Sequence, residues 1–349
     1  MADERTELSK LGEFGLIDRL TDGIELQHKS SVKGIGDDAA VIDQGENYGL
    51  LSTDMLVEGV HFDLSYAPLP HLGYKAIAVN ASDMAAMNGL PTQIVIALGI
   101  SNRFSLEAVE ALYQGMKAAA KDFKIDLVGG DTTSSNSGLI ISVSVYGQVA
   151  KDRITYRKGA KANDILCATG DLGAAFIGLQ VLEREKQTFL ANPNMQPKLD
   201  EYTYVVERQL KPIARLDIVH ELKELGVIPT SMIDVSDGLA SECLHLSKQS
   251  QVGFAIYEDQ LPIDKMTYDT AVEFKMDPVT AVMNGGEDYE LLFTIDQKDH
   301  DKLEKHRDIH FIGHAHETTK GNVLVTKKGN LVPITAQGWD HLNKDNKKE

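Results

Sequence analysis

The chain has 349 residues, enough for two domains of ordinary size, and its 42% hydrophobic and 25% charged residues are typical of a globular protein. Its formal net charge of -17 argues against a general nucleic-acid or anionic-membrane surface, because such surfaces need clustered lysine and arginine. If so acidic a protein handles phosphates, metal ions are the expected counter-charge.

Three features of the sequence bear on the cellular location of the protein. The first ten residues, MADERTELSK, are charged and contain no apolar segment, so we expect no secretory signal. No apolar stretch approaches the roughly 20 residues that a membrane-spanning helix needs. The two cysteines, Cys167 and Cys243, fit no zinc spacing and are expected to be reduced thiols. These features predict a cytoplasmic protein that binds neither nucleic acid nor membrane.

The first half alternates predicted strands and helices. Residues 72–89 are rich in alanine and stop at Gly89 and Pro91, which indicates a helix. A second, amphipathic helix is expected over 105–123, with Ser105 as its N-cap. The predicted strands of this half are 39–43, 48–55, 92–100, 125–131 and 138–149.

The stretch from 150 to 164 is polar and basic, so we place a domain boundary near Ala150 and predict domains 1–150 and 151–349. The second half also alternates predicted strands and helices. Its predicted strands are 164–170, 231–236 and 289–295, and its predicted helices are 173–185 and 237–249. Residues 189–202 read as a surface loop and 343–349 as a frayed tail.

Acidic residues recur at predicted strand ends and turns, often beside glycine, serine or threonine. The set is Asp37, Asp38, Asp54, Asp83, Asp131, Asp234, Asp237, Glu287 and Asp288. Mg²⁺ prefers hard oxygen ligands and is held by one or two carboxylates together with substrate phosphates, so these segments suit several magnesium ions along a polyphosphate. Ordinary turn and capping chemistry is the alternative for each site. Asp83 fits that alternative poorly, because aspartate has low helix propensity and lies inside a predicted helix.

Two common phosphate-binding motifs are absent. The sequence contains no G-x-x-x-x-G-K-[ST] loop. It also lacks a G-x-G-x-x-G motif in the strand-to-helix context of a dinucleotide site. A nucleotide enzyme without the loop lysine must neutralise its phosphates by other means, and magnesium is the obvious candidate.

Six stretches in order closely resemble the thiamine-monophosphate kinase family: GIGDDAAV, STDMLVEGVHF, YKAIAVNASDMAAMNG, LVGGDTTSS, IDVSDGLAS and NGGEDYELLF. That family belongs to a superfamily of ATP-dependent enzymes with aminoimidazole ribonucleotide synthetase and selenophosphate synthetase. The resemblance extends from residue 12 to residue 342. It implies an α/β protein with mixed sheets and two domains, in which the N-terminal sheet closes a barrel with a second subunit and the C-terminal sheet packs against helices.

The resemblance also implies an activity: transfer of the γ-phosphoryl group of ATP to thiamine monophosphate by direct, magnesium-assisted in-line attack, the last step of thiamine diphosphate synthesis. On matching positions, metal ligands are expected at Asp38, Ser52, Thr53, Asp54, Asp83, Asp131, Asp234 and Asp237, with Asp37 a weaker candidate. Of these, Asp38, Asp83, Asp131 and Asp237 are the expected catalytic residues. ATP contacts are expected at Tyr113, Gly130, Asp131, Arg157 and Ser236, and substrate contacts at His61, Glu287 and Trp339.

Three of these residues have plainer alternatives. His61 suits a core or surface histidine as well as a ligand contact. Arg157 lies among other basic residues of a polar linker, although arginine can also grip phosphate with two parallel hydrogen bonds. Trp339 is the only tryptophan, and it either pins the tail to the core or stacks on a cationic ring.

Two rival functions remain open at this point. A related synthetase would phosphorylate an amide or formyl oxygen, and a substrate panel would separate it from the kinase. A non-catalytic divalent-cation-binding protein would use the same acids and show no nucleotide turnover. Selenophosphate synthetase is disfavoured, because it carries a reactive cysteine or selenocysteine near the N-terminus, where this chain has none.

Overall fold

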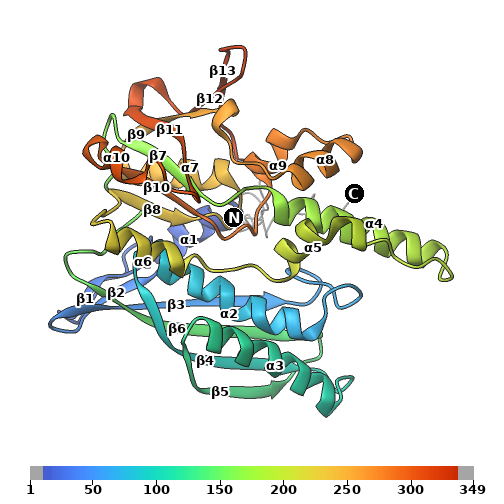
Figure 1. Ribbon diagram of the computed structural model, residues 1–349. Coiled ribbons are helices and arrows are strands. Elements are labelled where there is room, and N and C mark those ends of the chain that lie inside the picture. The colour runs from blue at the N-terminus through green and yellow to red at the C-terminus, as the bar shows by residue number, and fades with distance from the viewer. Residues whose placement is uncertain (1–10, 337–349) are drawn as a thin grey trace, which may run out of the picture.

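A computed structural model describes residues 11–336, in which two β-sheets are packed with helices (Figure 1). The first sheet has the strand order β1-β2-β3-β6-β4-β5 and the second β13-β12-β9-β11-β7-β10-β8. Both sheets are mixed: β4 and β5 run parallel in the first, β12 and β9 run parallel in the second, and the other pairs are antiparallel. The predicted α/β class with mixed sheets is therefore confirmed.

The first sheet and its helices occupy the first 150 residues. Their bounds are α1 Gly12–Thr21, β1 Ser31–Lys33, β2 Ala40–Asp43, β3 Asn47–Val57, α2 Leu69–Ala86, β4 Leu90–Ile100, α3 Leu106–Asp122, β5 Asp126–Ser134 and β6 Ile140–Ala150. Every strand and helix predicted for this half has its counterpart here. Ser105 caps α3 as expected, since its side chain accepts a hydrogen bond of 3.3 Å from the Ala108 amide.

The second sheet and its helices follow. Their bounds are β7 Ile165–Thr169, α4 Ala174–Ala191, α5 Thr203–Leu210, α6 Leu216–Glu224, β8 Ser231–Asp234, α7 Leu239–Ser250, β9 Val252–Tyr257, α8 Lys265–Glu273, α9 Pro278–Asn284, β10 Leu291–Ile295, α10 His300–Leu303, β11 Ile309–Glu317, β12 Val323–Val325 and β13 Leu331–Pro333. The loop predicted over 189–202 is wrong at both ends, because α4 continues to Ala191 and 200–202 form a 3-10 turn. The tail 343–349 lies outside the described residues.

Helix α2 lies between the two sheets (Figure 1). Along nearly its whole length it is buried, in contact with β3, β4 and β6 on one side and with β8, α5 and α6 on the other. Small residues let α3 lie close against α2: a Cβ on Gly73 of α2 would lie 2.0 Å from the Leu112 carbonyl oxygen of α3, and one on Gly115 of α3 would lie 1.8 Å from the Pro70 carbonyl oxygen of α2. One hydrophobic core therefore runs from the first sheet across α2 to Phe293 of the second.

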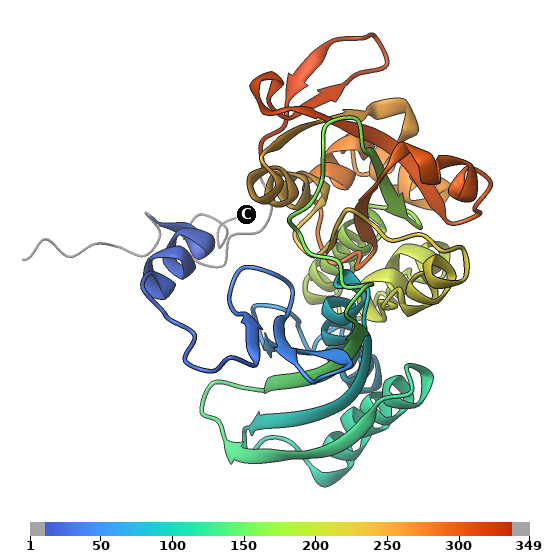
Figure 2. The ribbon, with the colours of Figure 1, turned by 90° about the vertical axis from the view of Figure 1, so that its left-hand side faces the viewer.

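The two faces of the first sheet differ. Helices α2 and α3 lie along one face (Figure 2). The opposite face, called the open face below, exposes apolar side chains: Leu51, Met55 and Val95 are 45%, 55% and 42% exposed. Strand β5 lies at the edge of this sheet and is exposed throughout.

The predicted division near residue 150 falls where β6 ends, before β7 begins at Ile165. One core joins the two halves through α2, so the division into domains 1–150 and 151–349 stays a prediction. No helix within residues 11–336 has the length and apolar character needed to cross a membrane.

Candidate active site

Three carboxylates from distant parts of the chain meet beside α2. Asp38 lies between β1 and β2, Asp83 on α2, and Asp234 at the end of β8. One oxygen of each lies within 4.8 Å of the others. The predicted grouping of these acids is thus seen, and it joins residues of both sheets.

Serine hydroxyls orient two of these acids. Ser52 of β3 donates a hydrogen bond of 2.6 Å to Asp83, and Ser82 of α2 donates one of 2.5 Å to Asp234. Asp54, two residues along β3 from Ser52, faces the same side of the sheet, because side chains alternate along a strand. Its amide donates to the Asn80 side chain at 3.2 Å, which ties β3 to α2.

Burial and mutual repulsion disturb the ionisation of this cluster. Burial, followed by the charge of Asp38, raises the pKa of Asp54 to about 6 and that of Asp234 to about 7. Burial and the charges of Asp54 and Asp234 raise the pKa of Asp83 well above its ordinary value. Carboxylates held this close are costly to ionise without a cation.

Arg157 supplies one positive charge to the cluster. Its guanidinium donates two hydrogen bonds to Asp38, Nη2 to Oδ1 at 2.7 Å and Nε to Oδ2 at 3.2 Å. Its amide donates to Asp37 at 2.8 Å, and Asp37 is also paired with Lys33. In this state Arg157 therefore holds the GIGDD turn, with Asp37 serving the turn and Asp38 facing the cluster.

The residues present fit a hard divalent cation. Asp38, Asp83 and Asp234 offer only oxygen atoms, and Asp54 and the hydroxyl of Ser52 lie beside them. Oxygen-only donor sets of this kind suit Mg²⁺ rather than softer metals. A bound dication would also relieve the repulsion among the acids that raises their pKa values.

Other predicted ligands lie elsewhere in the chain. Thr53 is on the open face, where it accepts a hydrogen bond of 3.1 Å from Ser144. Asp131 lies on β5 in register with Ala97 of β4. Strands β6 and β4 separate β5 from β3, which is roughly 14 Å at the usual strand spacing. One chain therefore does not bring Asp131 to the three-acid cluster.

The expected ATP contacts Gly130 and Tyr113 are also away from this cluster. Gly130 is on β5, and a Cβ there would lie 1.9 Å from the Ile96 carbonyl oxygen, so the glycine is needed for strand packing. Tyr113 is half-buried on α3, where it packs against the core that runs from the first sheet across α2.

Two loops of the second half lie against each other beside Asp234. The Glu287 amide donates to the Ser236 carbonyl at 2.7 Å, and the Tyr289 amide to that of Val235 at 2.9 Å. The Asp237 amide donates to Glu242 at 2.8 Å. The expected metal, nucleotide and substrate segments of this half thus form one unit.

Glu287 lies near a pocket between α2, α5 and residues 61–67. The pocket is lined by His61, Phe62, Tyr66, Ala67, Leu72, Lys75, Gln209 and Leu210. His61 accepts a hydrogen bond of 3.0 Å from the Val57 amide. Glu287 pairs with Lys75 at 2.8 Å. Two of the three predicted substrate residues are therefore at or beside this pocket, and the third, Trp339, lies outside the described residues.

Sequence reasoning missed Ser82, Glu242, Lys75 and Gln209. Ser82 lies in the motif VNASDM, directly before the predicted ligand Asp83. Glu242 ends the stretch DGLASE, which begins with the predicted ligand Asp237. Lys75 had a usable signal, because a charged residue in the otherwise apolar start of an alanine-rich helix needs a partner. Gln209 lies outside every motif and gave none.

Comparison with known proteins places the chain among relatives of similar length. The family model described as "AIR synthase related protein, N-terminal domain" matches residues 36–149. Thiamine-monophosphate kinase of Bacillus subtilis (strain 168) is 33% identical over 338 residues, covering 95% of this chain and 100% of the relative. That of Aquifex aeolicus (strain VF5) is 33% identical over 96% of this chain and 99% of the relative. A solved structure described as "AaThiL complexed with AMPPCP and TMP" matches with a TM-score of 0.81 and 32% identity, over 97% of this chain and 99% of that one.

Proposed function

Because the chain belongs to the thiamine-monophosphate kinase family, we propose that it transfers the γ-phosphoryl group of ATP to thiamine monophosphate, forming thiamine diphosphate and ADP. The observation that carries this proposal is the match over 97% of the chain to a solved protein described as holding AMPPCP and TMP. AMPPCP is an ATP analogue, so that protein binds a nucleotide and a phosphate acceptor together.

The acidic cluster is proposed to hold magnesium ions, with Asp38, Asp54, Asp83 and Asp234 as ligands and Asp237 from the adjoining loop. When bound, magnesium neutralises phosphate charge and positions the reacting groups. The seryl hydroxyls of Ser52 and Ser82 keep two of these carboxylates in place.

The reaction needs no general base from the chain. A phosphate monoester has a second pKa of about 6, so the attacking oxygen is already largely ionised near neutral pH. The chain's own residues must instead bring two anions together and exclude other acceptors. Arg157 suits this task, since its guanidinium can bind phosphate with two hydrogen bonds in place of Asp38.

A homodimer is part of the proposal, because it would bring Asp131 to the site. The open face exposes Leu51, Met55 and Val95, and among the described strands β5 has a neighbour on one side only, β4. Strand β2 pairs with β3 only over residues 48–51, so within residues 11–336 no strand lies beside Thr53 and Asp54 on that edge of β3. A second copy whose β5 lies along this edge would place its Asp131 near those ligands.

Subunit mixing tests this arrangement. We expect the D38N and D131N variants each to be inactive alone. If Asp131 acts in the partner's site, mixed dimers carry one intact site, and roughly a quarter of the wild-type activity returns after refolding the two together. If no activity returns although mixed dimers form, Asp131 does not act across the interface.

Product analysis tests the function itself. Purified protein is incubated with ATP, Mg²⁺ and either thiamine monophosphate or free thiamine, and ADP and thiamine diphosphate are measured. Diphosphate formed from the monophosphate, and lost with EDTA, is the expected result. ADP release without diphosphate would refute the proposed acceptor. A cytoplasmic location completes the proposal, in keeping with two buried free thiols, Cys167 and Cys243.

A further inference from the structure

One buried carboxylate beside the acidic cluster is not among the proposed metal ligands. Glu242, in the first turn of α7, is 2% exposed. Its Oε1 accepts a hydrogen bond of 2.8 Å from the Asp237 amide. Carboxylates are almost never fully buried unless they are paired or hydrogen-bonded, so this contact is the first place to look for the role of Glu242.

Helix α7 begins without a side-chain cap. Its N-cap residue is Gly238, which has no side chain to accept from the first amides of the helix. Gly238 has a φ of 109°, and a Cβ there would lie 3.0 Å from the Met283 and Gly285 carbonyl oxygens. In a capping box, a glutamate reaches back to the amide of the N-cap residue. Glu242 reaches one residue further back, to the amide of Asp237.

The turn that carries Asp237 is held on its other side by residues 286–290. The Ser236 carbonyl accepts a hydrogen bond of 2.7 Å from the Glu287 amide. A Cβ on Gly286 would lie 2.2 Å from the same carbonyl oxygen, so the two backbones are in close contact. The turn is therefore fixed by a neighbouring segment at Ser236 and by one side chain at Asp237.

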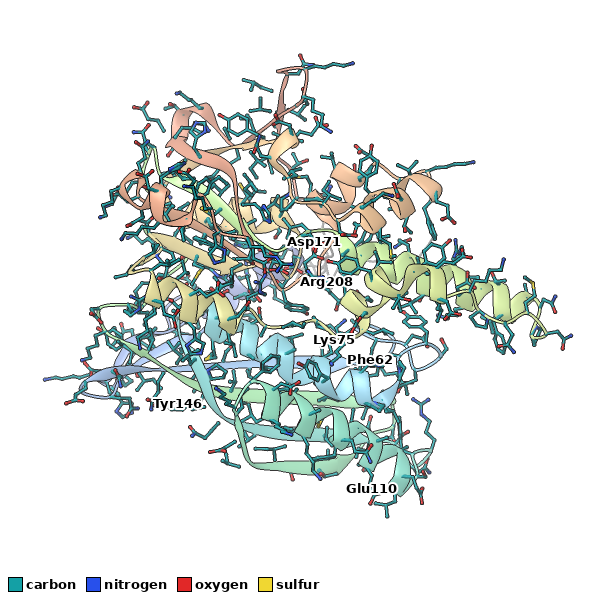
Figure 3. The ribbon with its side chains drawn as sticks, viewed as in Figure 1. Phe62, Lys75, Glu110, Tyr146, Asp171 and Arg208 are labelled. Atoms are coloured by element: carbon teal, nitrogen blue, oxygen red, sulfur yellow. The ribbon has the colours of Figure 1, made fainter. Side chains whose placement is uncertain are left out.

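The neighbouring segment is itself anchored. Arg208 of α5 donates to the Asp288 carbonyl at 3.4 Å and to the Glu290 carboxylate at 3.0 Å. Arg208 lies beside Asp171, whose carbonyl accepts from it at 3.1 Å (Figure 3). Because one side of the turn is anchored in this way, the hydrogen bond to Glu242 sets the direction of the Asp237 amide.

Other acids of the cluster have partners that orient them. Seryl hydroxyls donate to Asp83 at 2.6 Å and to Asp234 at 2.5 Å, and Arg157 donates twice to Asp38. For Asp237, the contact with Glu242 is made to the backbone. Partners of this kind orient metal ligands, and their loss typically costs about 10–100-fold in metal affinity.

We propose that Glu242 is a positioning residue of the metal site. By accepting from the Asp237 amide, it fixes the turn in the position that makes the Asp237 carboxylate available to the metal ions. It acts through this hydrogen bond and not as a metal ligand. The inference rests on the proposed function, because Asp237 and the neighbouring acids are magnesium ligands in that proposal.

Binding of Mn²⁺ alone, followed by electron paramagnetic resonance, tests this role without turnover. Mn²⁺ takes the same kinds of oxygen ligand as Mg²⁺. E242Q keeps an acceptor oxygen and should bind Mn²⁺ nearly as tightly as the wild type. E242L removes the acceptor and should raise the Kd for Mn²⁺ by about tenfold or more.

Three results would overturn the proposal. Equal losses in E242Q and E242L would mean that Glu242 acts by its charge or as a ligand. An unchanged Kd in E242L would mean that it serves only the start of α7. A wild type that binds no Mn²⁺ would remove the metal site on which the role depends.

E185L is the matched control. Glu185 of α4 is 8% exposed, and its Oε2 accepts from the Lys198 amide at 2.8 Å. E185L therefore loses a contact of the same type outside the metal-binding segments, and its Kd for Mn²⁺ should equal that of the wild type. Circular dichroism and thermal unfolding establish that each variant is folded. If E242L does not fold, E242A gives the same comparison, since alanine also lacks an acceptor and adds no bulk.

A double-mutant comparison shows whether Glu242 acts through Asp237. D237N should weaken Mn²⁺ binding by itself, and E242L should add little in the D237N background. Additive losses of binding free energy would reject the positioning role. The kinase assay separates this inference from the proposed function. A wild type that forms no thiamine diphosphate, yet shows the expected Mn²⁺ results, would refute the function and leave the role of Glu242 in place.

Discussion

Replacing Asp234 by asparagine should raise stability while it lowers activity. Asp234 is 4% exposed, and burial beside Asp38 raises its pKa to about 7 from an ordinary value of 3.8. In the folded protein it therefore holds its proton at pH values where the unfolded chain has released it. A carboxyl with a raised folded pKa makes stability fall as pH rises, here between about pH 4 and pH 7.

The magnitude follows from the same pKa values. At about 1.36 kcal/mol for each pKa unit, the difference between 3.8 and about 7 corresponds to roughly 4 kcal/mol of lost stability above pH 7. Asparagine removes the ionisation and can keep the hydrogen bond from Ser82. In EDTA, D234N should therefore be more stable than the wild type at pH 8, by up to roughly 4 kcal/mol, and similar to it at pH 4.

The assay is chemical denaturation of both proteins across pH 4–8, with EDTA and with Mg²⁺, alongside the kinase assay. Magnesium should stabilise the wild type at pH 8 and stabilise D234N much less, because a ligand has been removed. Turnover should fall in D234N by on the order of 10²–10³. If the free energy of unfolding of the two proteins had the same pH dependence in EDTA, the raised pKa of Asp234 would be refuted.

Three further changes have defined outcomes. D38N should leave the far-ultraviolet spectrum intact and reduce turnover by on the order of 10²–10³, and full activity would exclude Asp38 from the site. S105A should reduce the free energy of unfolding by about 1 kcal/mol through loss of the α3 cap, with kinetics unchanged. F293A should lower the free energy of unfolding by about 3–5 kcal/mol in urea denaturation, because Phe293 is fully buried where the core crosses α2, and a loss below about 1 kcal/mol would contradict that packing.

Local pattern was sufficient to predict most of the first sheet. Strands such as 92–100 carry β-branched and apolar residues bounded by clear breaks, and α3 has both a cap and an apolar face. Short elements such as β1 in the first half and α10 in the second were not predicted, since three or four residues carry too little periodicity. The length of α4 was underestimated because no residue after Glu185 in this helix is buried, and Phe189 and Leu190 there are 45% and 64% exposed, so its last residues show no buried apolar face.

The acids Asp38, Asp83 and Asp234 were predicted from their motifs, and the structure brings them together. Their contact depends on how α2 fits between the sheets, which no local pattern reports. The positions of Thr53 and Asp131 show the opposite limit: strand alternation fixes the face on which a side chain lies, but the sequence does not report whether a predicted ligand acts in its own chain or in a partner's. Gln209 could not be found from sequence, because it lies outside every motif and lines the pocket only through the packing of α5.

Helix α2 also bears on how the chain can change over generations. The helix touches both sheets, carries Lys75 at one end and Asp83 at the other, and crosses α3 at Gly73. A substitution there alters two interfaces and two binding regions at once. In a library of random variants we therefore expect α2 to accept the fewest replacements, and the β12–β13 hairpin at the far edge of the second sheet to accept many. Fragments made by cutting the chain between the sheets would also have to compete for this single helix.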